Sequence, residues 1–271
     1  MFSPLKAPLP GQKSVTHNKI KEVYYTAPVD NIESILKIGI LSHNRAYQLK
    51  LLKPELDISN PEVQDLRRKK TIRSPYNQDT RPLHDYVNLY PQPFNAMMVA
   101  VRLAKPDLDL CVLRISSDIL DISGTLITNM NAACANAKTF KPSDWTLPPS
   151  DFEAIRSLFF KTGDIKADES TQKAFKRTRQ FEVLVLDFIL SRYINGIFVP
   201  NERLKQDIIA RTGGIIPVEV NKSLFLCDTS IQQLRLFKPL PKRLRESVAP
   251  TNPFTLMMAA SSKKSRNSHA S

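Results

Sequence analysis

The pattern of hydrophobic and polar positions divides the chain into short strands and short helices. Apolar residues at 32, 35, 36 and 38 have helical spacing, with Asp30 or Asn31 as the expected N-cap and Gly39 at the expected end. Runs of β-branched, apolar and aromatic residues predict strands at 23–25, 82–90, 111–115, 181–186, 197–199 and 217–220. Further helices are expected at 62–71, 151–160 and 202–211, and residues 96–101 fit either a helix or a strand. Because the elements do not alternate as in βαβ units, the expected fold class is α+β.

Polar and proline-containing stretches set the expected domain limits. Residues 1–20 are polar and basic, and we expect them to form a flexible arm. Residues 239–271 are rich in proline, serine and basic side chains and are expected to be a disordered tail. One folded domain is therefore expected over 21–238. Inside it, 42–82 is a long polar stretch of the kind that often forms a binding loop, and 123–150 is expected to be loop-like.

The composition describes a globular and strongly basic protein. The chain has 271 residues, of which 42% are hydrophobic and 24% charged, enough apolar material for a sizeable core. A net charge of +13 favours polyanionic partners such as nucleic acid or an anionic membrane. The N-terminus lacks a signal-peptide core, and no run approaches the ~20 apolar residues of a membrane span. We therefore expect a cytoplasmic protein without membrane segments.

Common catalytic and cofactor signatures are missing from the sequence. The three cysteines are widely spaced and form no CxxC pair, which argues against a disulfide framework or a zinc site. No GxGxxG, GxxxxGK[ST], HExxH or GxSxG pattern occurs. A nucleotide site in this chain would have to be of another kind, and no metal is expected.

Two charged residues are candidates for chemistry. Glu182 interrupts an apolar strand, where an ionised carboxylate is costly unless it is paired or lies on the wet face. It is therefore either a solvent-facing strand residue or a carboxylate that the strand holds in a cleft. Arg67 belongs to a basic run, 67–70, which is either a solvated helix face or a source of guanidinium groups for anion binding.

Other pairs of residues are weaker candidates. His84 and Asp85 are neighbours on an expected strand, would point to opposite faces, and so are not expected to form a catalytic dyad. Met97 and Met98 are more typical of a core than of a ligand platform.

Several motifs occur in an order that is specific as a set. They are Tyr24-Tyr25-Thr26, the stretch 63–68 with Gln64 and Arg67, the stretch 81–90 with Leu-His-Asp-Tyr-Val, and 179–185 with Gln-Phe-Glu-Val-Leu-Val. Together they resemble the DarT family of DNA ADP-ribosyltransferase toxins over about residues 20–220.

The resemblance implies a fold, a reaction and partners. The fold would be that of ADP-ribosyltransferases, a split β-sandwich with a central NAD cleft and flanking helices. Members of the family transfer ADP-ribose from NAD to bases of single-stranded DNA, commonly thymidine and in some branches guanosine. A macrodomain antitoxin typically reverses the modification. NAD as substrate, single-stranded DNA and a macrodomain-type antitoxin are thus expected for this chain.

The resemblance also implies roles for single residues. Glu182 falls on the family's catalytic glutamate. Arg67 falls on its catalytic arginine and is preferred to Arg68 because it stands three residues after Gln64. The NAD-binding element would lie near 43–70 and the DNA-presenting loop near 129–181. The NAD-binding positions expected are Tyr25, Thr26, Ala27, Ser34, Leu41, Arg67 and Met97, and the DNA-binding positions Lys138, Lys141 and Arg179.

One part of the motif set differs from the family pattern and leaves two alternatives open. The family's first strand usually carries Tyr-His-x-Thr, whereas this chain has Tyr25 and Ala27 at the His and Thr places. A protein with the fold but without transferase activity would bind nucleic acid through its basic surface alone. An ADP-ribosyltransferase that modifies RNA or protein is the second alternative.

Overall fold

The computed structural model describes residues 20–52, 58, 61–93, 95, 97–98, 101–102, 105–145 and 181–225. The chain divides into two units, 1–226 and 227–271, and every described residue belongs to the first. The helix predicted at 151–160 and the tail predicted at 239–271 lie outside the described residues. So does the predicted arm, except for Ile20, whose side chain is buried in the core.

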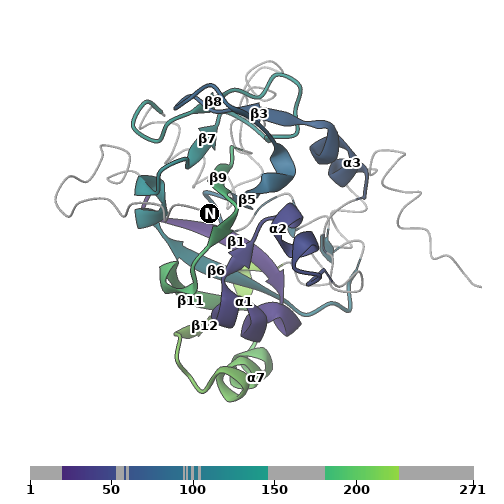
Figure 1. The fold of residues 1–271 in the computed structure, drawn as a ribbon. Coiled ribbons are helices and arrows are strands. Elements are labelled where there is room, and N and C mark those ends of the chain that lie inside the picture. Colours follow the sequence, from purple (N-terminus) through teal and green to yellow (C-terminus); the bar gives the residue numbers. More distant parts are fainter. Residues whose placement is uncertain are drawn as a thin grey trace, which may run out of the picture. The chain divides into compact units, whose positions relative to one another are not determined.

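The first of two four-stranded sheets has the order β1-β6-β11-β12 (Figure 1). Its strands are β1 (Glu22–Pro28), β6 (Leu110–Ser116), β11 (Ile194–Val199) and β12 (Val218–Val220). The central strand β6 pairs antiparallel with β1 and β11, and β12 joins β11 in parallel. Residues 110–113 form a continuous apolar run because this strand is buried on both faces.

The second four-stranded sheet has the order β5-β9-β7-β8 and is antiparallel throughout. Its strands are β5 (Tyr86–Leu89), β7 (Leu126–Thr128), β8 (Thr139–Phe140) and β9 (Val183–Leu186). The expectation that 123–150 is loop-like is wrong where β7 and β8 form, since strands of two or three residues are too short to leave a periodic pattern. The strand predicted at 82–90 begins only at Tyr86, because Pro82 ends β4 and Leu83–Asp85 form the 3-10 turn η3.

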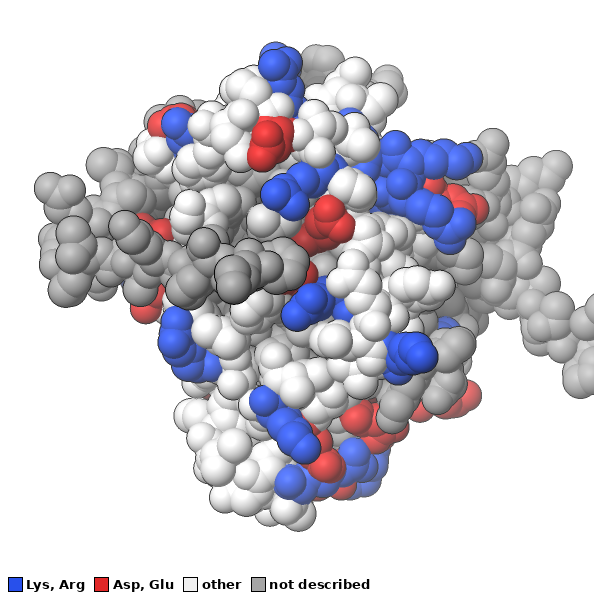
Figure 2. All heavy atoms as spheres, viewed as in Figure 1, with Lys and Arg blue, Asp and Glu red and all other residues white. Residues whose placement is uncertain are grey.

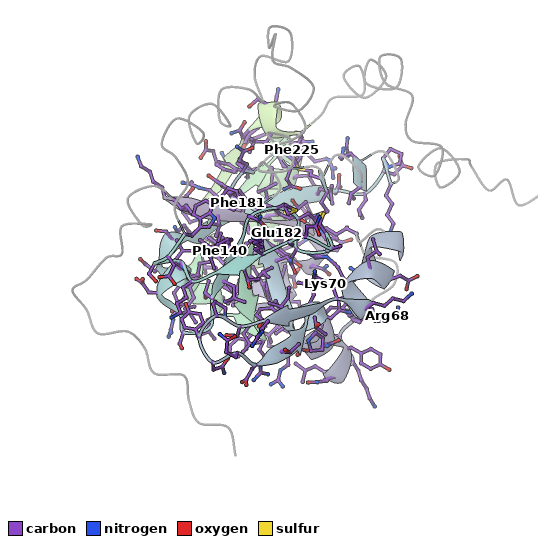
Figure 3. All side chains as sticks on the ribbon, turned by 90° about the horizontal axis from the view of Figure 1, so that it is seen from above. Arg68, Lys70, Phe140, Phe181, Glu182 and Phe225 are labelled. Atoms are coloured by element: carbon purple, nitrogen blue, oxygen red, sulfur yellow. The ribbon has the colours of Figure 1, made fainter. Side chains whose placement is uncertain are left out.

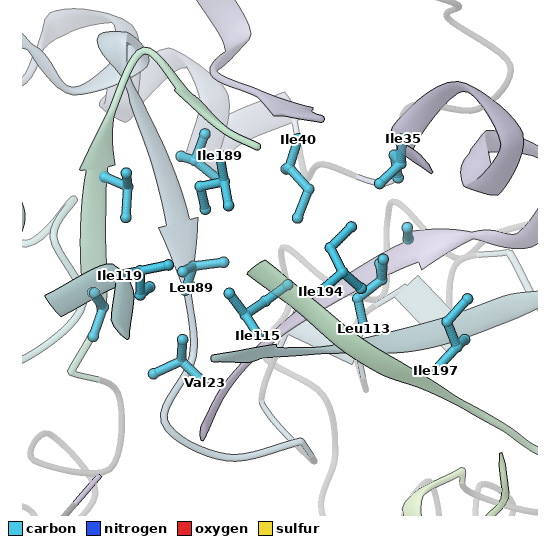
Figure 4. Packing of buried hydrophobic residues seen from close by; sticks show 14 of the residues in the cluster. Val23, Ile35, Ile40, Leu89, Leu113, Ile115, Ile119, Ile189, Ile194 and Ile197 are labelled. Carbon is cyan, nitrogen blue, oxygen red and sulfur yellow. The ribbon is translucent and has the colours of Figure 1, made fainter. Parts of the chain in front are cut away.

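Side chains from both sheets meet in one hydrophobic cluster. Leu89 of β5, Ile115 of β6 and Val183 of β9 are all buried in it, and Figure 4 shows Leu89 and Ile115 facing each other between their strands. The two sheets are also joined through the backbone, because Tyr24 and Tyr90 exchange two hydrogen bonds of 2.7 and 2.9 Å. The end of β5 is therefore fixed against β1.

Helices and short paired strands surround the sheets. The helices are α1 (Ile32–Ile38), α2 (His43–Gln48), α3 (Pro61–Lys69) and α7 (Glu202–Thr212). Residues 97–98 and 101–102 are also helical, in agreement with one of the two predictions for 96–101. The 3-10 turns are η1 (Val29–Asn31), η4 (Ser117–Asp121), η5 (Ser191–Tyr193) and η6 (Lys222–Leu224). Strand β2 (Ile40–Leu41) pairs with β10 (Phe188–Ile189), and β3 (Thr71–Arg73) pairs with β4 (Thr80–Pro82).

The ends of the helices match the sequence in position but differ in capping. Asn31 occupies the N-cap of α1, yet its side chain caps nothing, because the helix continues directly from η1. Asp30 accepts a hydrogen bond of 2.9 Å from Arg211 of α7 instead. Gly39 ends α1 as expected, with φ 93°. Among the described residues, no helix has the length and apolarity needed to cross a membrane.

Candidate active site

A cavity of about 410 Å³ opens between β1, α1, α2, α3 and β5. Its wall is mixed, with apolar side chains such as Ile35 and Leu83 beside polar ones such as Gln64 and His84. The structure brings all of the predicted NAD-binding positions to this one cavity: Tyr25, Thr26, Ala27, Ser34, Leu41, Arg67 and Met97 line it. Residues separated by up to about seventy positions in the sequence thus share one site.

Glu182 lies directly before β9 and is completely buried, with 0% of its surface exposed. The interpretation of Glu182 as a solvent-facing strand residue is therefore wrong. Its Oε2 accepts hydrogen bonds from Arg67 Nη2 at 2.9 Å, from Asn88 Nδ2 at 2.6 Å and from the Ala132 amide at 3.4 Å. Figure 3 shows Glu182 in the interior, whereas Arg68 reaches outward.

The backbone on either side of the carboxylate is held by Thr128 of β7. The Glu182 amide donates to Thr128 Oγ1 at 2.9 Å, and the Thr128 amide donates to the Glu182 carbonyl at 2.9 Å. The Thr128 hydroxyl donates in turn to the Met130 carbonyl at 2.6 Å. Glu182 Oε1 has no hydrogen-bond partner among the described residues. A buried carboxylate oxygen without a donor is unfavourable, so this atom can accept one more hydrogen bond.

Arg67 lies in the last turn of α3, and its side chain is only 12% exposed. Burial alone would lower the pKa of its guanidinium, but the charge of Glu182 and the hydrogen bond to its carboxylate raise that pKa above its ordinary value. Arg67 is therefore a fixed positive charge. The next residue, Arg68, is 72% exposed and pairs at 3.6 Å with Asp65 on the helix surface. The structure thus brings Arg67, and not Arg68, to Glu182.

Asn88 and Tyr90 also belong to this site, although neither was among the residues predicted for it. Asn88 lies between the buried residues Val87 and Leu89, and this alternation was the available signal that it faces another way. Tyr90 also lines the cavity. Burial and the nearby Glu182 charge raise the pKa of its hydroxyl, while Arg67 opposes them, so the phenol keeps its proton. Asn88 and Tyr90 add uncharged polar groups to the charged pair.

Two histidines form part of the cavity wall. The rings of His43 and His84 lie with their centroids 4.4 Å apart, tilted by 38°. Burial, followed by His43, Arg67 and Arg68, lowers the pKa of His84 to about 4, against the opposing charge of Asp85. His84 is therefore neutral near pH 7, and its Nε2 has no partner among the described residues. Asp85 accepts a hydrogen bond of 2.7 Å from Asn44, and His84 and Asp85 lie in a turn rather than on the predicted strand.

The predicted DNA-binding lysines lie apart from the residues that line the cavity. Lys138 is exposed just before β8, and Lys141 follows β8 with its Nζ 5.3 Å from the centre of the Tyr76 ring. Arg179 lies outside the described residues. Figure 2 shows basic side chains gathered over α3, on the face of the molecule that carries this helix in Figure 1.

The arrangement is suited to stabilising positive charge in a ligand. No cluster of three or more His, Cys, Asp or Glu side chains that could hold a metal ion occurs within the described ranges. Cys111 is buried, and burial raises the pKa of its thiol, so it is not a reactive thiolate. The chemistry available is that of one buried carboxylate, one fixed guanidinium and neutral hydrogen-bonding groups.

Comparison with known proteins gives a consistent picture. The model of the family described as "ssDNA thymidine ADP-ribosyltransferase, DarT" matches residues 24–226. A DNA ADP-ribosyl transferase–DNA ADP-ribosyl glycohydrolase fusion protein of Thermosipho africanus is 29% identical over 211 residues, which are 73% of this chain and 48% of the relative.

Solved structures agree with that match. Thermosipho africanus DarTG in complex with ADP-ribose superposes with a TM-score of 0.59 at 27% identity, over 76% of this chain and 51% of that one. Thermus sp. 2.9 DarT in complex with ADP-ribosylated ssDNA superposes with a TM-score of 0.57 at 16% identity, over 76% of this chain and 97% of that one. At this identity the match shows the fold alone. The chain thus spans about half the length of the fusion relatives that it matches.

Proposed function

Because the chain belongs to the DarT family of single-stranded-DNA thymidine ADP-ribosyltransferases, we propose that it transfers ADP-ribose from NAD to a thymidine base in single-stranded DNA. The observation that carries the proposal is the pairing of buried Glu182 with Arg67, 2.9 Å apart, where Arg67 lines a cavity with the other positions expected to bind NAD. Guanosine is the second base to test.

The arrangement of sheets supports the corresponding fold. We infer that the sheets β1-β6-β11-β12 and β5-β9-β7-β8 are the two halves of the split β-sandwich. The shared hydrophobic cluster and the Tyr24–Tyr90 bridge hold the halves together on one side. The cavity would then be the NAD cleft, with α1, α2 and α3 as flanking helices.

Glu182 would act on the ribose of NAD that carries nicotinamide. Breaking the bond between C1′ and the nicotinamide nitrogen leaves an oxocarbenium-like sugar, and nicotinamide departs with the bonding electrons. A carboxylate beside that sugar holds its hydroxyl groups and stabilises the positive charge. The Oε1 atom, which lacks a partner among the described residues, is the atom that would accept the sugar hydroxyl.

Arg67 would act on negative charge rather than as a base. Bond formation between C1′ and thymine N3 requires that N3 lose its proton, which passes to water, since a guanidinium cannot accept one. The raised pKa of Arg67 keeps it charged, so it stabilises the developing imide anion or a phosphate of NAD. In duplex DNA thymine N3 is paired, which accounts for a single-stranded substrate.

The partners follow from the same family. Since a relative joins a DNA ADP-ribosyl transferase to a DNA ADP-ribosyl glycohydrolase, we propose that a glycohydrolase antitoxin, of the macrodomain type, removes the modification that this chain makes. The chain would then be the toxin of a toxin–antitoxin pair that acts on DNA in the cytoplasm.

The proposal is tested by incubating the protein with labelled NAD and thymidine-containing single-stranded oligonucleotides, followed by mass spectrometry of the product. We expect an ADP-ribosylated thymidine with the wild-type protein. Glu182→Gln removes the charge but keeps the size, and we expect at least a ~100-fold loss of transfer, as for removal of one group that stabilises the transition state electrostatically. Full transfer by Glu182→Gln would show that the catalytic assignment is wrong.

Parallel substrates separate the remaining alternatives. Duplex DNA, oligonucleotides without thymidine, RNA and a mixture of proteins are offered under the same conditions. Modification of RNA or protein alone would replace the proposal with the corresponding ADP-ribosyltransferase. Binding of single-stranded DNA without transfer to any substrate would favour a nucleic-acid-binding protein that has the fold but not the activity.

A further inference from the structure

The donors around Glu182 come from separate elements, and the shortest of the three hydrogen bonds comes from Asn88. We propose that Asn88 is a positioning residue, which fixes Oε2 of Glu182 so that Oε1 is left for the substrate. The inference rests on the proposed function, in which Glu182 acts on NAD.

The pairing of β5 with β9 brings the two side chains together. The register aligns Asn88 with Leu184, so Glu182, two residues earlier, is a diagonal neighbour on the same face of the sheet. Strand β5 is the edge strand of this sheet, and Asn88 also lines the cavity. Asn88 is therefore placed between the cavity and the buried carboxylate, on a rigid element.

The chemistry of the contact fixes the orientation of the amide. A carboxylate only accepts hydrogen bonds, so the Asn88 nitrogen must face Glu182 at 2.6 Å, and the amide oxygen faces away. The amide carries no charge. It orients the carboxylate without neutralising it, and thereby leaves the negative charge of Glu182 available to the sugar.

The proposed role differs from that of Arg67. Arg67 has a long side chain with several rotatable bonds, whereas the side chain of Asn88 has only two rotatable bonds and extends from a strand. The Asn88 side chain is therefore the more firmly positioned of the two. When Arg67 turns toward a phosphate or a base anion, its hydrogen bond to Glu182 is lost or lengthened. Asn88 and the Ala132 amide would still hold Oε2, so the carboxylate keeps its position during the reaction.

The test compares two substitutions of Asn88 with a matched control. Asn88→Ala removes the donor, and we expect kcat for ADP-ribose transfer to fall about 10- to 100-fold, as for loss of a hydrogen bond to a charged group, with KM for NAD changed less than about threefold. Asn88→Asp keeps the size but places two carboxylates in contact, and we expect a loss of at least about 100-fold near pH 7.5.

The pH dependence distinguishes positioning from a general loss of structure. In Asn88→Asp one proton shared between the carboxyl groups restores a donor, so its deficit should shrink toward pH 5, while that of Asn88→Ala should stay constant relative to wild type. Arg67, Tyr90, His43 and His84 are further charged or titratable groups of this cavity, and all four are common to the wild-type protein and its variants. The control is Gln206→Glu, which makes the same amide-to-carboxylate change beside Glu202 on α7, where the contact is 2.9 Å and exposed.

Activity measurements and crystal structures of the variants together decide whether Asn88 positions Glu182. The inference is overturned if wild-type protein transfers ADP-ribose and Asn88→Ala keeps kcat within threefold, or if both Asn88 variants lose activity only in proportion to the decrease in folded protein. A crystal structure of Asn88→Ala should show the Glu182 carboxylate rotated or in two positions. An unmoved carboxylate overturns the inference even if the wild-type protein proves inactive, and that inactivity would count against the proposed function instead.

Discussion

At the scale of single residues, the central feature is a buried ion pair with unequal partners. Glu182 is fully buried, while Arg67 reaches it from a helix and also lines the cavity. Removing one member of a buried pair leaves an uncompensated charge, which costs more than the pair itself contributes. The two residues should therefore behave as a unit in both stability and activity.

This pairing predicts a sharp difference between adjacent arginines. Arg67→Ala should abolish transfer and lower the free energy of unfolding by about 3–5 kcal/mol, because the buried carboxylate of Glu182 is then left without its charged partner. Arg68→Ala removes a 72% exposed side chain and should change the free energy of unfolding by less than about 0.5 kcal/mol. Urea unfolding and the oligonucleotide assay measure both effects. Equal effects of the two substitutions would mean that Arg67 has been assigned wrongly.

At the scale of elements, the turn between α1 and β2 shapes one wall of the cavity. Gly39 has φ 93° and packs so closely on β10 that a Cβ there would overlap the Ile189 carbonyl oxygen. Ile38, Gly39 and Ile40 all line the cavity. The glycine thus permits the pairing of β2 with β10 that places this wall.

A pair of glycine substitutions tests the importance of this contact. Gly39→Ala should lower the free energy of unfolding by about 2–4 kcal/mol, since backbone strain and steric overlap add together. Gly124→Ala is the control: its φ of 88° is nearly the same, but a Cβ there meets nothing within 4 Å, so only the strain of about 1 kcal/mol remains. Thermal or urea unfolding measures the difference, and equal destabilisation by the two substitutions would contradict the close approach.

Helix α3 connects the ion pair with the loop that follows β7. Lys70, directly after the helix, donates to the carbonyls of Cys134 and Ala135 at 3.0 and 3.2 Å. The same loop supplies the Ala132 amide to Glu182. Because α3 carries Arg67 as well, a single element positions two of the three donors of the carboxylate, one directly and one through this loop.

At the scale of the whole molecule, the net charge of +13 is the dominant property. Basic side chains gather over α3 (Figure 2), and Lys138 and Lys141 directly precede and follow the edge strand β8 in the sequence. A single strand of DNA that reaches the cavity would be held largely through its phosphates, in a way that does not depend on sequence.

Salt titration of DNA affinity measures this contribution. The logarithm of the association constant should fall linearly with the logarithm of salt concentration, with a slope of about 0.7 for each phosphate that the protein binds. Replacing both Lys138 and Lys141 by alanine should make this salt dependence less steep. The magnitude of the slope should decrease by about 0.7 for each phosphate that these lysines bind in the wild-type protein. Lys222→Ala, in η6 and outside the cavity lining, should leave the slope unchanged. Affinity that does not depend on salt would exclude phosphate binding as the main source of affinity.

The sequence by itself determined the local features of this protein. Hydrophobic periodicity identified β6, β9, α1 and α7, because each carries enough apolar or capping residues within one segment. The order of motifs identified the family, and with it Glu182 and Arg67 as the candidates for catalysis. Hydrophobic periodicity did not predict β7 and β8, because these short segments are strands only through their pairing with neighbouring strands.

Only the tertiary structure decided the environment of Glu182. The alternation of residues around Glu182 fits an exposed strand residue as well as it fits a buried carboxylate. No local sequence pattern indicates which face of a strand is covered by the rest of the protein. Burial, the Arg67 contact across 115 positions and the Asn88 contact across 94 arise from packing between distant segments. Because the cost of burying a charge depends on its partners, the catalytic interpretation of Glu182 rests on contacts that one segment of sequence cannot specify.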